Sequence, residues 1–178
     1  MAFMSIDSFR NQVTGIARST LFQVDVVMNK GAIGFNTYNF TFTCKAAEIP
    51  SSTFGKIEVP FMGRKVFFIG DRMYNDWNTT VIVDNDWTSY KNIYDWHQKM
   101  NDPRKNVATM GNAYDMNAFK GEATITAFDQ AGNPKLRVRL DGFFPYDMQA
   151  LQMDWSNTDT TADLTVVWAY DFAELLTI

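Results

Sequence analysis

The two residue types most used as nucleophiles, bases and metal ligands, histidine and cysteine, occur once each in this sequence. His97 lies on the apolar face of a segment with helical periodicity, next to Trp96, which favours a core or helix-end histidine over a general base or a metal ligand. Cys44 alternates with Phe40 and Phe42 along an expected strand, so we expect a small buried side chain rather than a reactive thiol. One cysteine cannot form an intrachain disulfide, and one residue of each type cannot supply the usual zinc ligands.

Residues 84–88, Asp-Asn-Asp-Trp-Thr, resemble the start of a calcium-binding loop. However, the sixth position is Ser89 where glycine is needed, and the twelfth is Asp95 rather than glutamate. A strand-to-helix junction with capping carboxylates accounts for these residues better. The sequence also contains no Gly-x-Ser-x-Gly, P-loop or Gly-x-Gly-x-x-Gly motif, and no pair of carboxylates stands out. We therefore expect no enzyme activity, no cofactor and no metal.

Length and composition predict one folded domain over residues 1–178, with 46% apolar residues and no apolar run long enough to span a membrane. The first ten residues lack the basic-then-apolar pattern of a signal peptide, so we expect a protein made in the cytoplasm without membrane insertion. Sixteen basic residues against twenty acidic ones give a net charge of −4, which disfavours ordinary binding to nucleic acid.

The apolar pattern predicts a mainly β (α+β) chain: an antiparallel β-sandwich or barrel of about seven strands, with a flanking helix and an N-terminal helix. We expect the N-terminal helix within residues 1–18 and the flanking helix at 87–101, with Trp87, Tyr90, Ile93, Tyr94, His97 and Met100 on its apolar face. Expected strands lie near 21–26 and 38–47, which together suggest a long hairpin, and near 57–60, 64–69, 77–84, 123–127, 136–140 and 164–170. Residues 49–55 suggest a non-regular excursion, and 101–120 a long polar loop.

The stretch 59–77 carries a basic pair, an Asp-Arg pair and an Asp-Trp pair along a β-type segment, without catalytic residue types beside them. Such a pattern is typical of a surface that binds other protein. With its flanks it forms an ordered series: Leu-Phe-Gln-Val at 21–24, Phe-Thr-Cys-Lys-Ala at 42–46, Val-Pro-Phe-Met at 59–62, Gly-Asp-Arg at 70–72 and Leu-Gln-Met-Asp-Trp at 151–155. This series resembles the tail tube proteins of contractile-tailed bacteriophages, of the T-even type.

The resemblance implies a hexameric ring whose inner strands join into one continuous β-barrel, and rings that stack into a hollow tube for genome delivery into the host cell. It implies four partner proteins besides other copies of the chain: the tail sheath protein, the baseplate or tube initiator, the tape-measure protein and the tail terminator. Double-stranded DNA would be non-sticking cargo, and the protein would be assembled in the host bacterial cytoplasm into the virion tail.

The resemblance also places the family's inter-ring stacking loop at residues 48–64. The candidate apolar contacts are Phe54, Ile57, Val59, Phe61 and Met62, and the candidate charged partners are Arg64, Lys65, Asp71 and Arg72. For Arg64 and Lys65 an ordinary solvated strand end is an equal alternative.

Because the chain is acidic, we hypothesise that the acidic excess is concentrated on the lumen wall, where it would repel DNA phosphates. Two other functions stay open: the tube of a related contractile injection system, such as a secretion system or bacteriocin, and a monomeric β-sandwich binding module.

Overall fold

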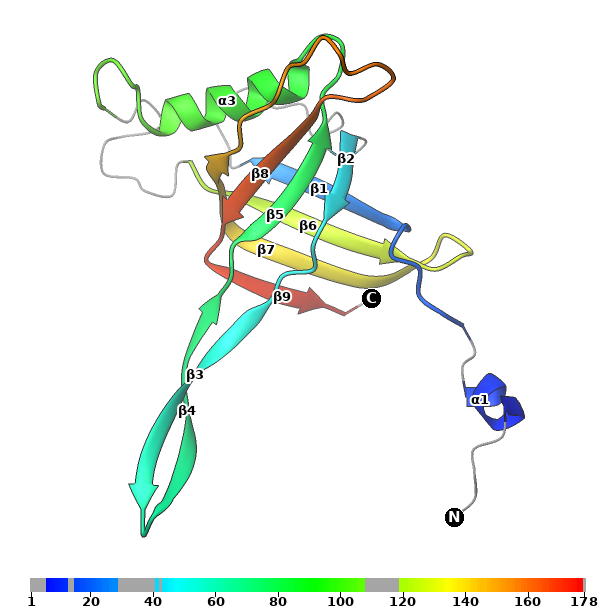
Figure 1. Ribbon diagram of the computed structural model, residues 1–178, viewed down its shortest axis with the longest axis vertical. Helices are drawn as coiled ribbons and strands as arrows, with labels where there is room; N and C mark the ends of the chain where they lie inside the picture. The colour runs from blue at the N-terminus through cyan, green and yellow to red at the C-terminus, as the bar shows by residue number, and fades with distance from the viewer. Residues whose placement is uncertain (1–5, 13–14, 29–40, 42, 108–118, 178) are drawn as a thin grey trace.

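The computed structural model describes residues 6–12, 15–28, 41, 43–107 and 119–177 (Figure 1). Its helices are α1 (Ile6–Gln12) and α3 (Thr88–Met100). Its strands are β1 (Phe22–Met28), β2 (Cys44–Ala47), β3 (Ser52–Phe61), β4 (Arg64–Tyr74), β5 (Trp77–Ile82), β6 (Gly121–Phe128), β7 (Pro134–Met148), β8 (Asp163–Ala169) and β9 (Phe172–Leu176). Every strand pairing is antiparallel, which confirms the predicted mainly β architecture with few helices.

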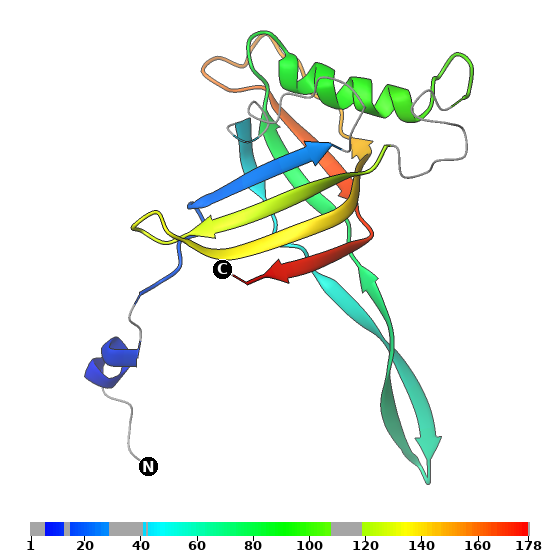
Figure 2. The same ribbon diagram turned by 180° about the vertical axis from the view of Figure 1, so that it is seen from behind.

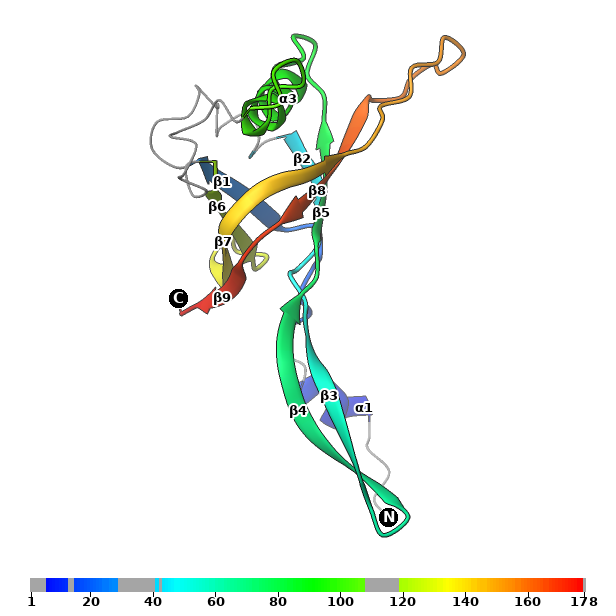
Figure 3. The ribbon, with the colours of Figure 1, turned by 90° about the vertical axis from the view of Figure 1, so that its left-hand side faces the viewer.

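The 15-residue strand β7 joins two layers of strands (Figure 3). Its first part, up to Phe143, pairs with β6 and β9, and β1 continues this layer beside β6. Its last part, from Phe144 to Met148, pairs with β8, followed by β5 and β2. Seven strands therefore belong to one connected sheet that folds over itself around a core.

Four large aromatic side chains fill the space between the layers and α3. The Phe143 and Trp168 rings stack with their centroids 4.3 Å apart, and Trp96 from α3 lies 5.8 Å from Trp168. Each buried indole N–H has an acceptor: Trp168 donates to the Thr79 hydroxyl at 2.7 Å, and Trp77 to the carbonyl of Glu48 at 2.6 Å. The core is thus both apolar and fully hydrogen-bonded at its indoles, as a buried tryptophan requires.

The helix α3 confirms the predicted helix but presents a different face to the core. Its buried residues are Ser89, Ile93 and Trp96, whereas Tyr94, which we expected to be buried, is 47% exposed. The spacing of four and three residues defines a face rotated from the predicted one, because Trp96 rather than His97 reaches the aromatic cluster.

Another expectation is wrong. The strands β1 and β2 do not form a hairpin with each other, because β1 pairs with β6 and β2 pairs with β5. The N-terminal helix lies within the predicted span, at Ile6–Gln12, and residues 15–18 are not helical. The chain also forms β9, which was not among the expected strands. Residues 29–40 and 42, which include Phe40 and Phe42 of the expected strand, lie outside the described residues.

Candidate assembly surface

The strands β3 and β4 form a long hairpin, residues 52–74, that extends away from the sandwich and is referred to below as the projecting hairpin (Figures 1 and 3). The predicted excursion and stacking loop at 48–64 is therefore mostly regular strand. The sequence did not reveal this because both faces of the hairpin are exposed, so no alternation of apolar and polar residues marks it.

One face of the projecting hairpin is apolar along its length. The register pairs Ile57 with Phe68, Val59 with Val66 and Phe61 with Arg64, so these side chains share one face. The apolar members of this face are all exposed: Ile57, Val59, Phe61, Val66 and Phe68. A contiguous exposed apolar surface of this kind marks a site of protein interaction.

The opposite face carries a small charge network. Glu58 accepts ion pairs from Lys65 at 2.8 Å and from Lys56 at 3.6 Å. The Lys56 ammonium also lies 4.3 Å from the centre of the Phe67 ring. The candidate interface residue Lys65 is therefore bound within its own hairpin, across the strand pair.

The other three charged candidates differ in their surroundings. The Arg72 guanidinium stacks over the Phe54 ring at 4.6 Å and lies near Tyr74, so it supports the base of the hairpin. Arg64 and Asp71 form no ion pair with any part of the chain that the structure describes. The predicted charged set thus separates into two residues that hold the hairpin and two whose charges point outward.

The tip of the projecting hairpin is a two-residue turn at Met62 and Gly63. Both have positive φ, 44° and 79°, as a type I′ turn requires. Glycine adopts this conformation without strain, but methionine does so at a cost of about 1 kcal/mol. The Met62 side chain is 89% exposed, so nothing within the described chain compensates for this cost.

We expect Met62→Asn to stabilise the projecting hairpin of the unassembled chain, because Asn-Gly is the preferred sequence for a type I′ turn. Amide hydrogen exchange at residues 57–68 will slow about fivefold, which corresponds to about 1 kcal/mol. Met62→Ala keeps the unfavourable φ and serves as the control. Equal exchange rates in the asparagine and alanine variants would show that the turn is not strained.

At the base of the projecting hairpin the two strands cross closely at a pair of glycines. A bulge between Phe54 and Lys56 places Gly55 against Gly70. A Cβ added to Gly70 would lie 3.0 Å from the carbonyl carbon and oxygen of Gly55, whereas one added to Gly55 would meet only ordinary contacts from 3.4 Å.

Gly70→Ala will consequently loosen the hairpin, and Gly55→Ala will not. We expect amide exchange in β4 to accelerate about tenfold in the first variant and to stay within twofold in the second. The two glycines make a matched pair, since both lie at the same crossing. Similar exchange in both variants would contradict a close backbone approach at Gly70.

A second surface is the outer face of the layer formed by β1, β6, β7 and β9 (Figure 2). The register aligns Asp25, Thr124, Arg139 and Glu174 in one row across the four strands. Arg139 pairs with Glu174 at 3.1 Å and lies 3.9 Å from Asp141. The paired strand positions of this face carry Asp25, Glu122, Asp141 and Glu174 against Arg137 and Arg139, an acidic excess, and Lys135 at the start of β7 pairs with Asp129.

The residues with reactive side chains are structural. Cys44 is partly buried against the core, and burial raises the pKa of its thiol to about 12, which disfavours the nucleophilic thiolate. Burial raises the pKa of the Asp84 carboxyl, but hydrogen bonds from Thr88 and from the Ser89 amide together outweigh this effect and hold the pKa below its usual value. Asp84 therefore binds the first turn of α3, as expected of a strand-to-helix junction, whereas Asp86 does not cap the helix.

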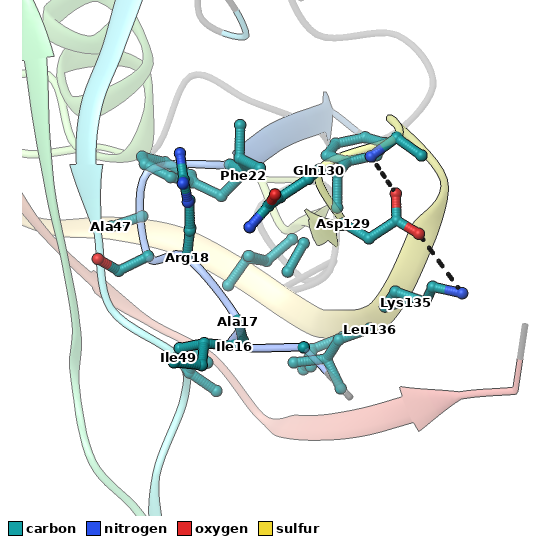
Figure 4. A pocket seen from close by; sticks show the side chains of 18 of the residues that line it. Ile16, Ala17, Arg18, Phe22, Ala47, Ile49, Asp129, Gln130, Lys135 and Leu136 are labelled. Carbon is teal, nitrogen blue, oxygen red and sulfur yellow. Dashed lines mark hydrogen bonds and ion pairs between the residues drawn. The ribbon is translucent and has the colours of Figure 1, made fainter. Parts of the chain in front are cut away.

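A groove of about 960 Å³ opens between the segment after α1 and the ends of β6 and β7 (Figure 4). Its lining is largely apolar, and the Asp129 carboxylate at its edge pairs with Lys135 at 3.5 Å. In the part of the chain described, no three histidine, cysteine or carboxylate side chains cluster as a metal would require. Nor does any described helix have the length and apolarity to cross a membrane.

A sandwich with a projecting hairpin whose apolar face is exposed is the architecture of a protein that binds other protein through its surface. A model of the phage tail tube protein family matches residues 17–172. The chain is also 31% identical over 159 residues to the tail tube protein gp19 of Enterobacteria phage T4, and equally to that of phage T6, covering 89% of this chain and 91% of each relative. The chain belongs to the phage tail tube protein family, and its role is that of a structural component of the tail.

Solved structures share the fold at low identity. A chain from the sheath/tube terminator of the extracellular contractile injection system PVC matches with a TM-score of 0.66 at 14% identity, over 93% of this chain and 99% of that one. A chain from the anti-feeding prophage baseplate matches with a TM-score of 0.64 at 13% identity, over 92% and 97%. At these identities the likeness concerns the fold alone.

Proposed function

We propose that the chain forms hexameric rings that stack into the inner tail tube, the conduit for delivery of the phage genome into the host cell. The observation that carries this proposal is the projecting hairpin, whose apolar side chains are each about half exposed in the described subunit. Exposure of apolar side chains to water is unfavourable in free energy, and burial by a second molecule removes this cost.

Ring closure is supported by the two free edges of the layer β1-β6-β7-β9. Its strands alternate in direction, so β1 and β9 at the edges run in opposite directions. In a ring related by rotation, β9 of one copy meets β1 of the next in antiparallel orientation. Such pairing removes the open sheet edges, which otherwise invite uncontrolled association.

The outer face of this same layer is our candidate for the lumen wall. Its acidic excess would repel the phosphates of DNA, so that the duplex slides without binding. The arginines on this face include Arg139, which is neutralised by Glu174 and Asp141.

The projecting hairpin is the candidate inter-ring contact. Its apolar contacts with the next ring would come from Phe54, Ile57, Val59, Phe61 and Met62. The outward charges of Arg64 and Asp71 would pair with groups of the next ring. Lys65 and Arg72 would act by holding the hairpin in shape. The tail sheath protein, the baseplate or tube initiator, the tape-measure protein and the tail terminator are the proposed further partners, and assembly would occur in the host cytoplasm.

A phage tube is favoured over the tube of another injection system, because the relatives that cover most of the chain at 31% identity come from phages. Electron microscopy of the purified protein tests the conduit. We expect six-fold rings and tubes with a central channel. A monodisperse 20.4 kDa monomer at high concentration would overturn the proposal and favour a monomeric binding module.

A further inference from the structure

We propose that the loop between β7 and β8, residues 149–162, is the acceptor that receives the tip of the projecting hairpin from a second copy of this chain. The inference rests on the proposed stacking of rings and names the partner surface of the hairpin.

The loop presents an aromatic side chain on an ordered turn. Trp155 is 103% exposed, and Met153 beside it is 71% exposed. Asp154 shapes the turn, because its carboxylate accepts hydrogen bonds from the Ser156 amide at 2.9 Å and the Ser156 hydroxyl at 2.7 Å. A tryptophan held outward on a defined turn has the character of an interface anchor.

The loop and the projecting hairpin have complementary charges. Residues 149–162 contain two aspartates, Asp154 and Asp159, and no lysine or arginine. The projecting hairpin has four basic residues and two acidic ones. At its tip Arg64 forms no ion pair with the described residues, so its charge is available to a partner.

The positions of the two surfaces suit a head-to-tail contact. The loop (orange) and the tip of the projecting hairpin lie at opposite ends of the long axis of the molecule (Figures 1 and 3). An open stack requires that a patch at one end fits a different patch at the other. The helix α3 lies at the same end as the loop but carries two lysines against one aspartate, so it suits a basic hairpin less well.

The chemistry of the contact follows from the residues at the two ends. A guanidinium such as that of Arg64 binds favourably over the face of an indole. The sulfur of Met62 can contact the edge of the same ring. The Asp154 and Asp159 carboxylates lie in the same loop and would balance the charge of Arg64, since Lys65 already pairs with Glu58.

A disulfide cross-link tests the contact directly. In a Cys44→Ser background, the double variant Met62→Cys with Asn157→Cys, which keeps Trp155 and uses an exposed residue of the same loop, is assembled and oxidised with copper phenanthroline. We expect a ladder of covalent multimers under non-reducing conditions, because each chain would join the next through unlike positions. The matched control combines Met62→Cys with Tyr94→Cys, which places the second thiol at the same end on α3, and it should give no ladder.

The outcomes separate this inference from the proposed function. Tubes without a ladder would overturn the acceptor loop while leaving the tube intact, and absence of both tubes and ladder would overturn both proposals. As a second measurement, Trp155→Ala should raise the protein concentration needed for tube formation at least tenfold, with an unchanged melting temperature. An unchanged assembly concentration would contradict the anchoring role of Trp155.

Discussion

Replacing Ile57, Val59 and Phe68 together by threonine will yield a folded protein whose tubes form only at about a hundredfold higher concentration. The three side chains share the exposed apolar face of the projecting hairpin. Burying each of them fully is worth about 1.5–3 kcal/mol, and about half of each is already covered in the single chain, so the loss per subunit is about 3 kcal/mol. Each 1.4 kcal/mol corresponds to a factor of ten in association.

Threonine retains high β-propensity, so the hairpin itself should persist. Pelleting of tubes by ultracentrifugation over a range of concentrations measures the effect, and far-UV circular dichroism checks the fold. Val107→Thr, an exposed apolar residue away from the hairpin, is the control and should pellet as the unaltered protein does. Normal tubes from the triple variant would show that this face is not the contact between rings.

The second large effect concerns stability. Trp168→Ala will lower the free energy of unfolding by about 4 kcal/mol, because a fully buried tryptophan leaves a large cavity beside Phe143 and Trp96. The substitution also removes the indole N–H that donates a hydrogen bond to the buried Thr79 hydroxyl.

Urea denaturation followed by far-UV circular dichroism measures this loss without relying on tryptophan fluorescence. The matched control is Trp155→Ala, which removes the same side chain from a fully exposed position and should change stability by less than about 0.5 kcal/mol. Similar losses in the two variants would mean that the aromatic cluster is not the centre of the core.

The parts of the fold that the sequence predicts best are those with one buried face. The strand β8 alternates Leu164, Val166 and Trp168 inward, and all three are fully buried. The helix α3 was predicted to within one residue at each end, but its face was not, because aromatic residues surround the helix and Trp96 competes with Tyr94 for the core.

Pairing between distant strands could not be predicted. The contact of β1 with β6 joins segments about a hundred residues apart, and no local pattern records it. The neighbours β1 and β2 in the sequence suggested a hairpin because nearby strands usually pair.

For the candidate site, the sequence pointed to a segment that folds as the projecting hairpin, but it did not predict the surroundings of the charged side chains. Whether Lys65 meets Glu58, or Arg72 meets Phe54, depends on the register of β3 and β4 and on the bulge between Phe54 and Lys56. A shift of one residue would move each of these side chains to the other face. Only the folded hairpin therefore distinguishes internal supports from outward charges.

The strand β7 has a mechanical consequence for the subunit. Since the same backbone belongs to both layers, the angle between the layers cannot change without bending β7 between Phe143 and Phe144. At that point the Phe143 ring stacks on the Trp168 ring of β8, so bending there would also disturb the core. A push on one layer is thus transmitted to the other through covalent bonds, so the stiffness of each subunit in a tube wall depends on its backbone as well as on the packing of side chains.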